Sequence, residues 1–337
     1  MSNREKCRYA RLDITRPDLA DCLRELGAAL VIHTAGPFQQ QGYGVPLAVA
    51  EAGAHYIDLA DGRRFVCDFA VAVDDAFRRQ RRVAITGAST VPALSSAVVN
   101  HLTEGWQRID RIDFCIAPVQ TAPRGVATLA AVLDYCGAPV QVWENGAWVE
   151  RRCWSRPEQV RFLRLRPRIG ALCDIPDLEL FPQHYRGVHT VMFRAALEIG
   201  MTQRALSAVA TCRQLGLIRR PDRFARLFNR TAGLLDRFGS ALGGMVVRVT
   251  GTDANGIDAQ RAWHIAADND HGPEIPCMAA ILLARRLARR LAREESMESG
   301  ARTAMGLLAL PEFVSEFNRW KMVTDIVDEA GSRQMHI

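Results

Sequence analysis

The segment Ala29-Leu30-Val31-Ile32-His33-Thr34-Ala35 is a nearly continuous apolar run, which Gly36-Pro37 brings to an end. Such a run is typical of a parallel strand that is covered on both faces. Outward from it, strand-like and helical stretches alternate through the first hundred residues. We expect strands at 9–13, 55–59 and 82–87, and helices at 17–26, 45–53, 65–79 and 95–102. This alternation predicts β-α-β units and a doubly wound, α/β parallel sheet.

The pattern changes after about residue 110. Asn145-Gly146 lies between two strand-like stretches, 140–144 and 147–150, and a second pair at 246–250 and 260–266 flanks the glycine turn 251–256. Both patterns predict β-hairpins. Further strands are expected at 159–165 and 188–194, and helices at 202–215, 222–238, 274–293 and 311–320. We therefore predict an inserted α+β domain with a largely antiparallel sheet.

The composition is that of an ordinary globular chain. The 337 residues are 48% hydrophobic and 24% charged, the net charge is +6, and every basic residue except Lys6 and Lys321 is arginine. The nine cysteines form no Cys-x-x-Cys pair, and no apolar run approaches the ~20 residues that cross a bilayer. We expect reduced thiols and a cytoplasmic protein. The arginines of 285–293 are expected to form a solvated helix face, with membrane association as the less favoured alternative and no nucleic-acid partner.

Three successive predicted strands end in small or hydroxyl-bearing residues: at 34–38, 59–62 and 86–89. In doubly wound sheets ligands bind beyond the carboxyl ends of the strands, and small residues let a backbone approach a cofactor. Three such ends in succession predict a binding crevice. No Gly-x-Gly-x-x-Gly turn follows a predicted strand, because Gly42-Tyr43-Gly44 follows the wrong strand and lacks the third glycine.

Several of these motifs, taken together and in order, resemble the saccharopine dehydrogenase-like family. They are Ala35-Gly36-Pro37-Phe38, then Gly53-Ala54-His55-Tyr56-Ile57-Asp58-Leu59, and then Thr86-Gly87-Ala88-Ser89 with Pro92; the stretches 272–276, 300–301 and 306–308 resemble its later part. The resemblance implies a Rossmann-type dinucleotide-binding domain at 1–115, an inserted substrate and oligomerisation domain at 116–271, and C-terminal helices at 272–337 that return to the first domain. It also implies a homodimer formed through the middle-domain sheet.

The resemblance also assigns residues to the cofactor NAD or NADP. Ala35, Gly36, Pro37 and Phe38 are expected on the nicotinamide side and Asp13 near the adenine. Thr86 and Gly87 are expected to bind the cofactor where it borders the substrate cleft, and Ser89 is expected to border the cleft on the substrate side. The family's first strand, glycine loop, first helix and second strand would precede Asn3. We therefore expect a start codon assigned too late or a shortened gene, with a short cofactor-free form as the alternative. Without the first strand, Val31 and Ile32 lose neighbours and a sheet edge opens.

The residues offer few candidate catalytic groups. His271, just before the helix expected at 274–293, is a candidate general acid or base, and the competing interpretation is an ordinary loop residue. Asp61 follows a strand end and is a candidate to orient an amine or hydroxyl. His184 and Arg194 are candidates to meet an acidic substrate. The Asp-x-Asp pattern at 268–270 lacks the glycine and glutamate of a calcium loop, so no metal site is expected.

These observations predict an NAD(P)-dependent oxidoreductase that transfers hydride to or from an unidentified small molecule. The alternative is a non-catalytic scaffold or partner subunit with a remnant of the dinucleotide-binding fold.

Overall fold

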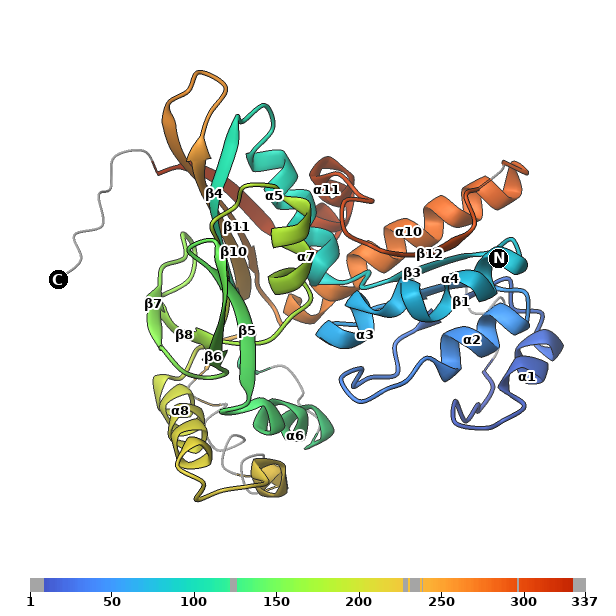
Figure 1. The fold of residues 1–337 in the computed structure, drawn as a ribbon, viewed down its shortest axis with the longest axis horizontal. Helices are drawn as coiled ribbons and strands as arrows, with labels where there is room; N and C mark the ends of the chain where they lie inside the picture. The colour runs from blue at the N-terminus through green and yellow to red at the C-terminus, as the bar shows by residue number, and fades with distance from the viewer. Residues whose placement is uncertain are drawn as a thin grey trace.

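The computed structural model describes residues 9–121, 126–226, 230, 237, 239–295 and 297–329. Two sheets dominate these residues, and Figure 1 shows them side by side with helices between and around them. Sheet A contains four strands and sheet B nine. We name the parts built on them the sheet-A unit (residues 9–102 and 275–303) and the sheet-B unit (the described residues of 108–267 and 310–328).

Sheet A is entirely parallel and has the strand order β1-β2-β3-β12. Its strands are β1 (Leu30–His33), β2 (His55–Asp58), β3 (Val83–Thr86) and β12 (Gly300–Thr303). Because the strands are parallel, all four carboxyl ends lie at the same edge. The doubly wound parallel sheet predicted from the alternating elements is therefore confirmed, and β12 is a strand that the sequence pattern did not predict.

Helices cover both faces of sheet A, as its alternating side chains require. Tyr56 and Ala84 point to one face and pack with residues of α2 (Gly44–Glu51) and α4 (Phe69–Arg79), alongside α1 (Leu19–Glu25) and α3 (Arg63–Cys67). Ile57 and Ile85 point to the other face, towards α10 (Ile275–Ala292). Strand β1 lies at an edge of the described sheet, and 43% of Ile32 is exposed.

Sheet B is largely antiparallel, and its main path runs β13-β11-β10-β4-β9-β5-β6, with β8 beside β9 and β7 beside β8. Only the β4–β9 pair is parallel. The strands are β4 (Arg108–Ala117), β5 (Pro139–Glu144), β6 (Ala147–Arg152), β7 (Glu158–Val160), β8 (Arg168–Leu172), β9 (Thr190–Leu197), β10 (Gly243–Thr252), β11 (Asp258–Ala267) and β13 (Val323–Asp328). Both predicted hairpins, β5–β6 and β10–β11, are present.

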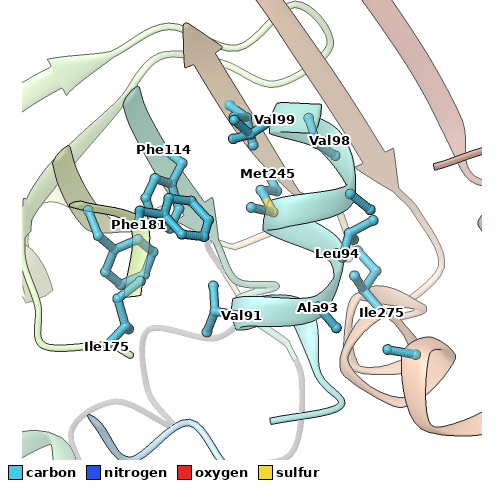
Figure 2. Packing of buried hydrophobic residues seen from close by; sticks show 14 of the residues in the cluster. Val91, Ala93, Leu94, Val98, Val99, Phe114, Ile175, Phe181, Met245 and Ile275 are labelled. Atoms are coloured by element: carbon cyan, nitrogen blue, oxygen red, sulfur yellow. The ribbon is translucent and has the colours of Figure 1, made fainter. Parts of the chain in front are cut away.

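Helix α5 (Ser95–Leu102) joins the two units. Six of its eight residues are buried, and a π-helical turn, η2 (Thr90–Leu94), leads into it from β3. Figure 2 shows Leu94, Val98 and Val99 beside Phe114 and Met245 of sheet B, with Ile275 of α10 close by. The largest hydrophobic core is therefore continuous from one face of sheet A to one face of sheet B.

The remaining helices flank sheet B or link it to α10. They are α6 (Val126–Tyr135), α7 (Asp177–His184), α8 (Gly200–Gln214) and α11 (Leu310–Arg319), with short 3₁₀ turns η3 (Pro221–Phe224) and η5 (Gly272–Glu274). Helix α7 packs on β5 and β9 of sheet B while α5 packs on β10 and β11, and Phe181 of α7 packs on Phe114 of β4.

Several predicted elements differ from the structure. Residues 9–13 form no strand, because no other described strand pairs with them, and 94% of Tyr9 is exposed. The strand expected at 159–165 is limited to β7, and the helix expected at 65–79 is divided at Asp68 into α3 and α4. Most of the helix expected at 222–238 lies outside the described residues.

Candidate functional site

Three turns lie together at the carboxyl edge of sheet A, each following one strand. Residues 34–37, after β1, are exposed to solvent, and Phe38 is buried behind them. Thr86, Gly87 and Ser89, after β3, are all buried. The turn after β2, residues 59–62, lies between these two, as the strand order requires. The first turn and Asp61 of the second turn are therefore the parts of these three turns that are exposed to a ligand.

Asp58, the last residue of β2, connects the turns after β2 and β3 by hydrogen bonds. Its Oδ1 accepts hydrogen bonds from the amides of Ala60 (2.9 Å) and Gly87 (2.8 Å) and from the hydroxyl of Thr86 (3.0 Å). The side chain is fully buried, and Oδ2 has no partner among the described residues. Burial raises the pKa of this carboxyl to about 6, although hydrogen bonding by Gly87, Ala60, Thr86 and Tyr56 opposes the shift.

His33 lies beside Asp58 on the same face of sheet A, because the two residues are register partners. Its Nδ1 is 2.9 Å from the hydroxyl of Tyr56, and its ring meets Phe38 edge-on. Burial lowers the pKa of His33, so the imidazole is neutral at physiological pH. Its Nε2 has no partner among the described residues.

The turns after β1 and β2 interlock closely. Gln41 donates from Nε2 to the main-chain oxygens of Ala35 and Pro37, and Gln39 donates to Asp61 (3.1 Å). A Cβ on Gly62 would lie 3.2–3.3 Å from the main chain of Phe38 and Gln39, so only glycine lets the two turns approach this closely. The geometry of the exposed turn is thus set by its neighbour.

Asp61 faces the sheet-B unit. It is exposed to solvent, yet the protein close around it raises the pKa of its carboxyl. The pKa of Tyr135, at the end of α6, is raised first by burial and then by the carboxylates of Asp174 and Asp61. Asp174 itself pairs with Arg63, at 3.1 Å. Asp61 of the sheet-A unit and Asp174 of the sheet-B unit therefore both lie within electrostatic reach of Tyr135, and Arg63 pairs with Asp174.

The predicted cofactor residues occupy different positions. Ala35, Gly36 and Pro37 are exposed at the edge of sheet A. Asp13 lies in an exposed turn before α1, where its Oδ1 accepts bonds from the amide and hydroxyl of Thr15. The structure does not bring Asp13 to the three strand-end turns by any contact that it describes.

The other predicted catalytic and substrate residues are dispersed. The ring of His271 lies tilted against that of Trp320 with ring centroids 4.9 Å apart, beyond the end of β11. His184 is exposed at the end of α7. Arg194, on β9, pairs with Glu158 at 2.7 Å on the face of sheet B that carries Cys115. None of the three has a described contact with Asp61, and their roles stay predictions.

Sequence reasoning missed Asp58, His33, Arg63, Tyr135 and Asp174. A charged residue in the otherwise apolar stretch 54–60 was the available signal for Asp58. The partners of Arg63 are 78 to 116 residues away in the chain, and no local pattern predicts them.

Within the described residues, no group of three or more His, Cys, Asp or Glu side chains is arranged to hold a metal ion. A helix of the length and apolarity needed to cross a membrane is likewise absent from the part of the chain that the structure describes.

No family model and no curated protein matches this sequence. The fold, however, is known. The structure matches apo saccharopine dehydrogenase (L-Glu forming) from Saccharomyces cerevisiae with a TM-score of 0.66 and 10% sequence identity, over 97% of this chain and 90% of that one. The chain shares its fold with saccharopine dehydrogenase. This agreement confirms the fold that the sequence motifs predicted.

Two further solved structures are more distant. An engineered D-amino acid dehydrogenase bound to NADP⁺ matches with a TM-score of 0.44 and 14% identity, over 91% of this chain and 88% of that one. The diaminopimelate (DAP) dehydrogenase of C. glutamicum, in complex with DAP, matches with a TM-score of 0.43 and 13% identity over the same shares. At these TM-scores neither carries an argument about this chain.

Proposed function

We propose that this chain is an NAD(P)-dependent oxidoreductase that acts by hydride transfer on a small molecule. The observation that carries the proposal is the exposed turn 34–37 at the carboxyl edge of a parallel sheet, in a fold shared with a dehydrogenase. Ligands of doubly wound sheets bind at this edge. NAD(P), when bound, supplies the hydride chemistry, and the protein supplies binding and orientation.

The residues of this turn fit the nicotinamide half of such a cofactor. Ala35, Gly36 and Pro37 are exposed, and the three atoms nearest to a Cβ on Gly36 would all belong to Phe38, at 3.7–3.9 Å. A flat ring can therefore approach the turn closely, with the ring of Phe38 beside it. Among the described residues no glycine-rich turn cradles a pyrophosphate, so we assign residues only to the nicotinamide half.

Asp61 is the group that we propose to contact the reacting molecule. Its carboxylate is held by Gln39 at the next strand end and is otherwise exposed. It is placed to accept a hydrogen bond from an amine or hydroxyl. The pKa of the Asp61 carboxyl is raised towards neutral pH, and a group whose pKa lies nearer the working pH can both accept and return a proton.

Calorimetric titration of the purified chain with NADPH and then NADH tests the proposal. We expect saturable binding to the wild type, followed by NADPH oxidation with a member of a panel of ketones, imines and activated alkenes. Ala35→Glu places a carboxylate on the exposed turn and is expected to weaken binding at least tenfold. Ala254→Glu, in the exposed turn between β10 and β11, is the matched control and leaves binding unchanged.

Absence of binding to the wild type would overturn the oxidoreductase proposal for this chain and favour the scaffold. Equal weakening by both variants would show that binding is not at the strand-end turn.

A further inference from the structure

Arg63 binds the sheet-A unit to the sheet-B unit. It is the first residue of α3, directly after the turn that carries Asp61 and Gly62, and its side chain is 9% exposed. Nε donates to Glu179 of α7 (2.9 Å), and Nη1 donates to the main-chain oxygen of Gln141 on β5 (2.8 Å) and to Asp174 (3.1 Å). All three acceptors belong to the sheet-B unit.

Neighbouring contacts strengthen this attachment. The guanidinium of Arg63 also lies over the ring of Trp148 on β6, 5.7 Å from its centroid. Arg64 pairs with the same Glu179 but is largely exposed. The Cys67 thiol, at the end of α3, faces the main-chain oxygen of Pro176 at 4.0 Å. A five-residue helix is thus tied to four segments of the other unit: β5, β6, the loop through Asp174, and α7.

The geometry of Arg63 suits it to hold separate segments in register. Its planar fork directs Nε and Nη1 to acceptors on different elements at once, whereas a lysine ammonium is a single point of charge. A buried guanidinium keeps its position only where its donors are satisfied, and here Nε and Nη1 both are. The side chain therefore fixes the position of the β2 turn relative to β5 and α7.

The turn that Arg63 anchors carries Asp61, and Asp174 accepts a hydrogen bond from Arg63 itself. Asp61 is therefore only two residues away in the chain from the side chain that binds Asp174. If α3 moves away from α7, the turn of Asp61 moves away from Asp174. The relative position of the two carboxylates is fixed only while Arg63 holds the two units in this arrangement.

We propose that Arg63 is a positioning residue, a latch that holds Asp61 of the sheet-A unit and Asp174 of the sheet-B unit in one site. That this site serves hydride transfer rests on the proposed function; the latch itself does not.

The Cys67 thiol reports on the latch without any ligand. It is partly buried against α7, and burial raises its pKa to about 12, so alkylation is slow. Arg63→Ala is expected to raise the iodoacetamide alkylation rate of Cys67 at least tenfold, read by peptide mass spectrometry. Cys22 of α1, also partly buried, is the internal control and changes less than twofold. Arg63→Lys is expected to give an intermediate rate, and Arg64→Ala no acceleration.

An unchanged Cys67 rate in folded Arg63→Ala would overturn the latch. Should that variant fail to fold, the double variant Asp174→Ala/Glu179→Ala removes two of the three acceptors of Arg63 and keeps Arg63 itself, and the same two outcomes apply to it. NADPH titration then separates the two proposals. With a functional site we expect Arg63→Ala, but not Arg64→Ala, to weaken NADPH binding at least fivefold. If the wild type binds no NADPH but Arg63→Ala accelerates the alkylation of Cys67, the proposed function is refuted and the latch is retained. If the wild type binds NADPH but Arg63→Ala leaves the alkylation rate of Cys67 unchanged, the latch is refuted and the proposed function is retained.

Discussion

Asp58 is the residue on which the strand-end turns depend. Its buried carboxylate holds the amides of Ala60 and Gly87 and the hydroxyl of Thr86. Burial disfavours the charged form of the Asp58 carboxyl, and its pKa is therefore raised from 3.8 to about 6. Between these values the folded chain binds more protons than the unfolded chain. Stability from this group therefore rises as the pH falls from about 6 to about 4.

Asp58→Asn removes this dependence. From about 1.4 kcal/mol per pKa unit, the unfolding free energy of the wild type relative to the variant should rise by on the order of 3 kcal/mol between pH 6 and pH 4. Urea unfolding across this range measures the difference, and Asp177, a second buried carboxyl with a raised pKa, titrates in both proteins and cancels. Asp13→Asn is the control: the pKa of Asp13 is lowered, so its difference has the opposite sign. A flat difference for Asp58→Asn would contradict the proposed burial cost.

Both the backbone conformation and the space around the residue require glycine at position 87. Its φ is +71°, and a Cβ would lie 2.7 Å from Cδ of Pro92. We expect Gly87→Ala to destabilise the protein by about 1–3 kcal/mol in urea unfolding. Gly44→Ala, in the first turn of α2 with no atom within 4 Å of the new Cβ, should be neutral or stabilising by up to about 1 kcal/mol. Equal effects of the two substitutions would mean that the Gly87 turn relaxes freely.

At the scale of the element, β1 and β2 show that the position of a strand in a sheet decides the burial of a side chain more than the residue type does. Ile32 and Ile57 are register partners on one face of sheet A, yet Ile32 is 43% exposed and Ile57 is fully buried. The difference arises because β1 lies at the edge of the described sheet. An exposed apolar edge strand favours association with other chains.

Ile32→Lys is expected to change the unfolding free energy by no more than about 0.5 kcal/mol and to reduce aggregation on heating, measured by light scattering. Ile57→Lys, the same change one strand further in, should prevent folding, because it buries an unpaired charge. Strong destabilisation by Ile32→Lys would show that the face of β1 is covered in solution.

The sequence predicted the elements whose patterns are local. Helix α5 begins and ends where the apolar periodicity indicated, and the Asn145-Gly146 turn lies between β5 and β6. Strand β4 was missed because its charged residues mask the alternation; Arg108 and Asp110, and likewise Arg111 and Asp113, pair along the strand. The candidate site was predicted only in part. The bond of Asp58 to Thr86 spans 28 residues and those of Arg63 far more, so only the folded sheet brings the partners together.

At the scale of the whole molecule, the continuous core predicts that the two units unfold together. Ile57 and Ile85 of sheet A share this core with Phe114 and Met245 of sheet B through α5. All six tryptophans lie at or after residue 106, outside α1–α5, so their fluorescence reports on the sheet-B unit. Ile57→Ala, in the sheet-A unit, should nevertheless lower the fluorescence midpoint in urea by an amount equivalent to about 2–5 kcal/mol.

Far-UV circular dichroism should give the same midpoint as the fluorescence for both the wild type and Ile57→Ala. A fluorescence midpoint that stays unchanged while the dichroism shifts would show two independently stable units. Val71→Ala, an exposed residue of α4, is the control and leaves both midpoints in place.

The last described segments place one strand in each sheet: β12 beside β3, and β13 beside β11. During synthesis, therefore, sheet A lacks its full set of described strands until the ribosome has translated past residue 303, and sheet B until it has translated past residue 328. The ribosome translates β12 about two hundred residues after β3, so sheet A is incomplete during this interval. The exposed side of β3 in the nascent chain is then a natural place for chaperones to bind. A stop codon at residue 320 would leave sheet A with all its described strands but would remove β13, the outer strand of sheet B.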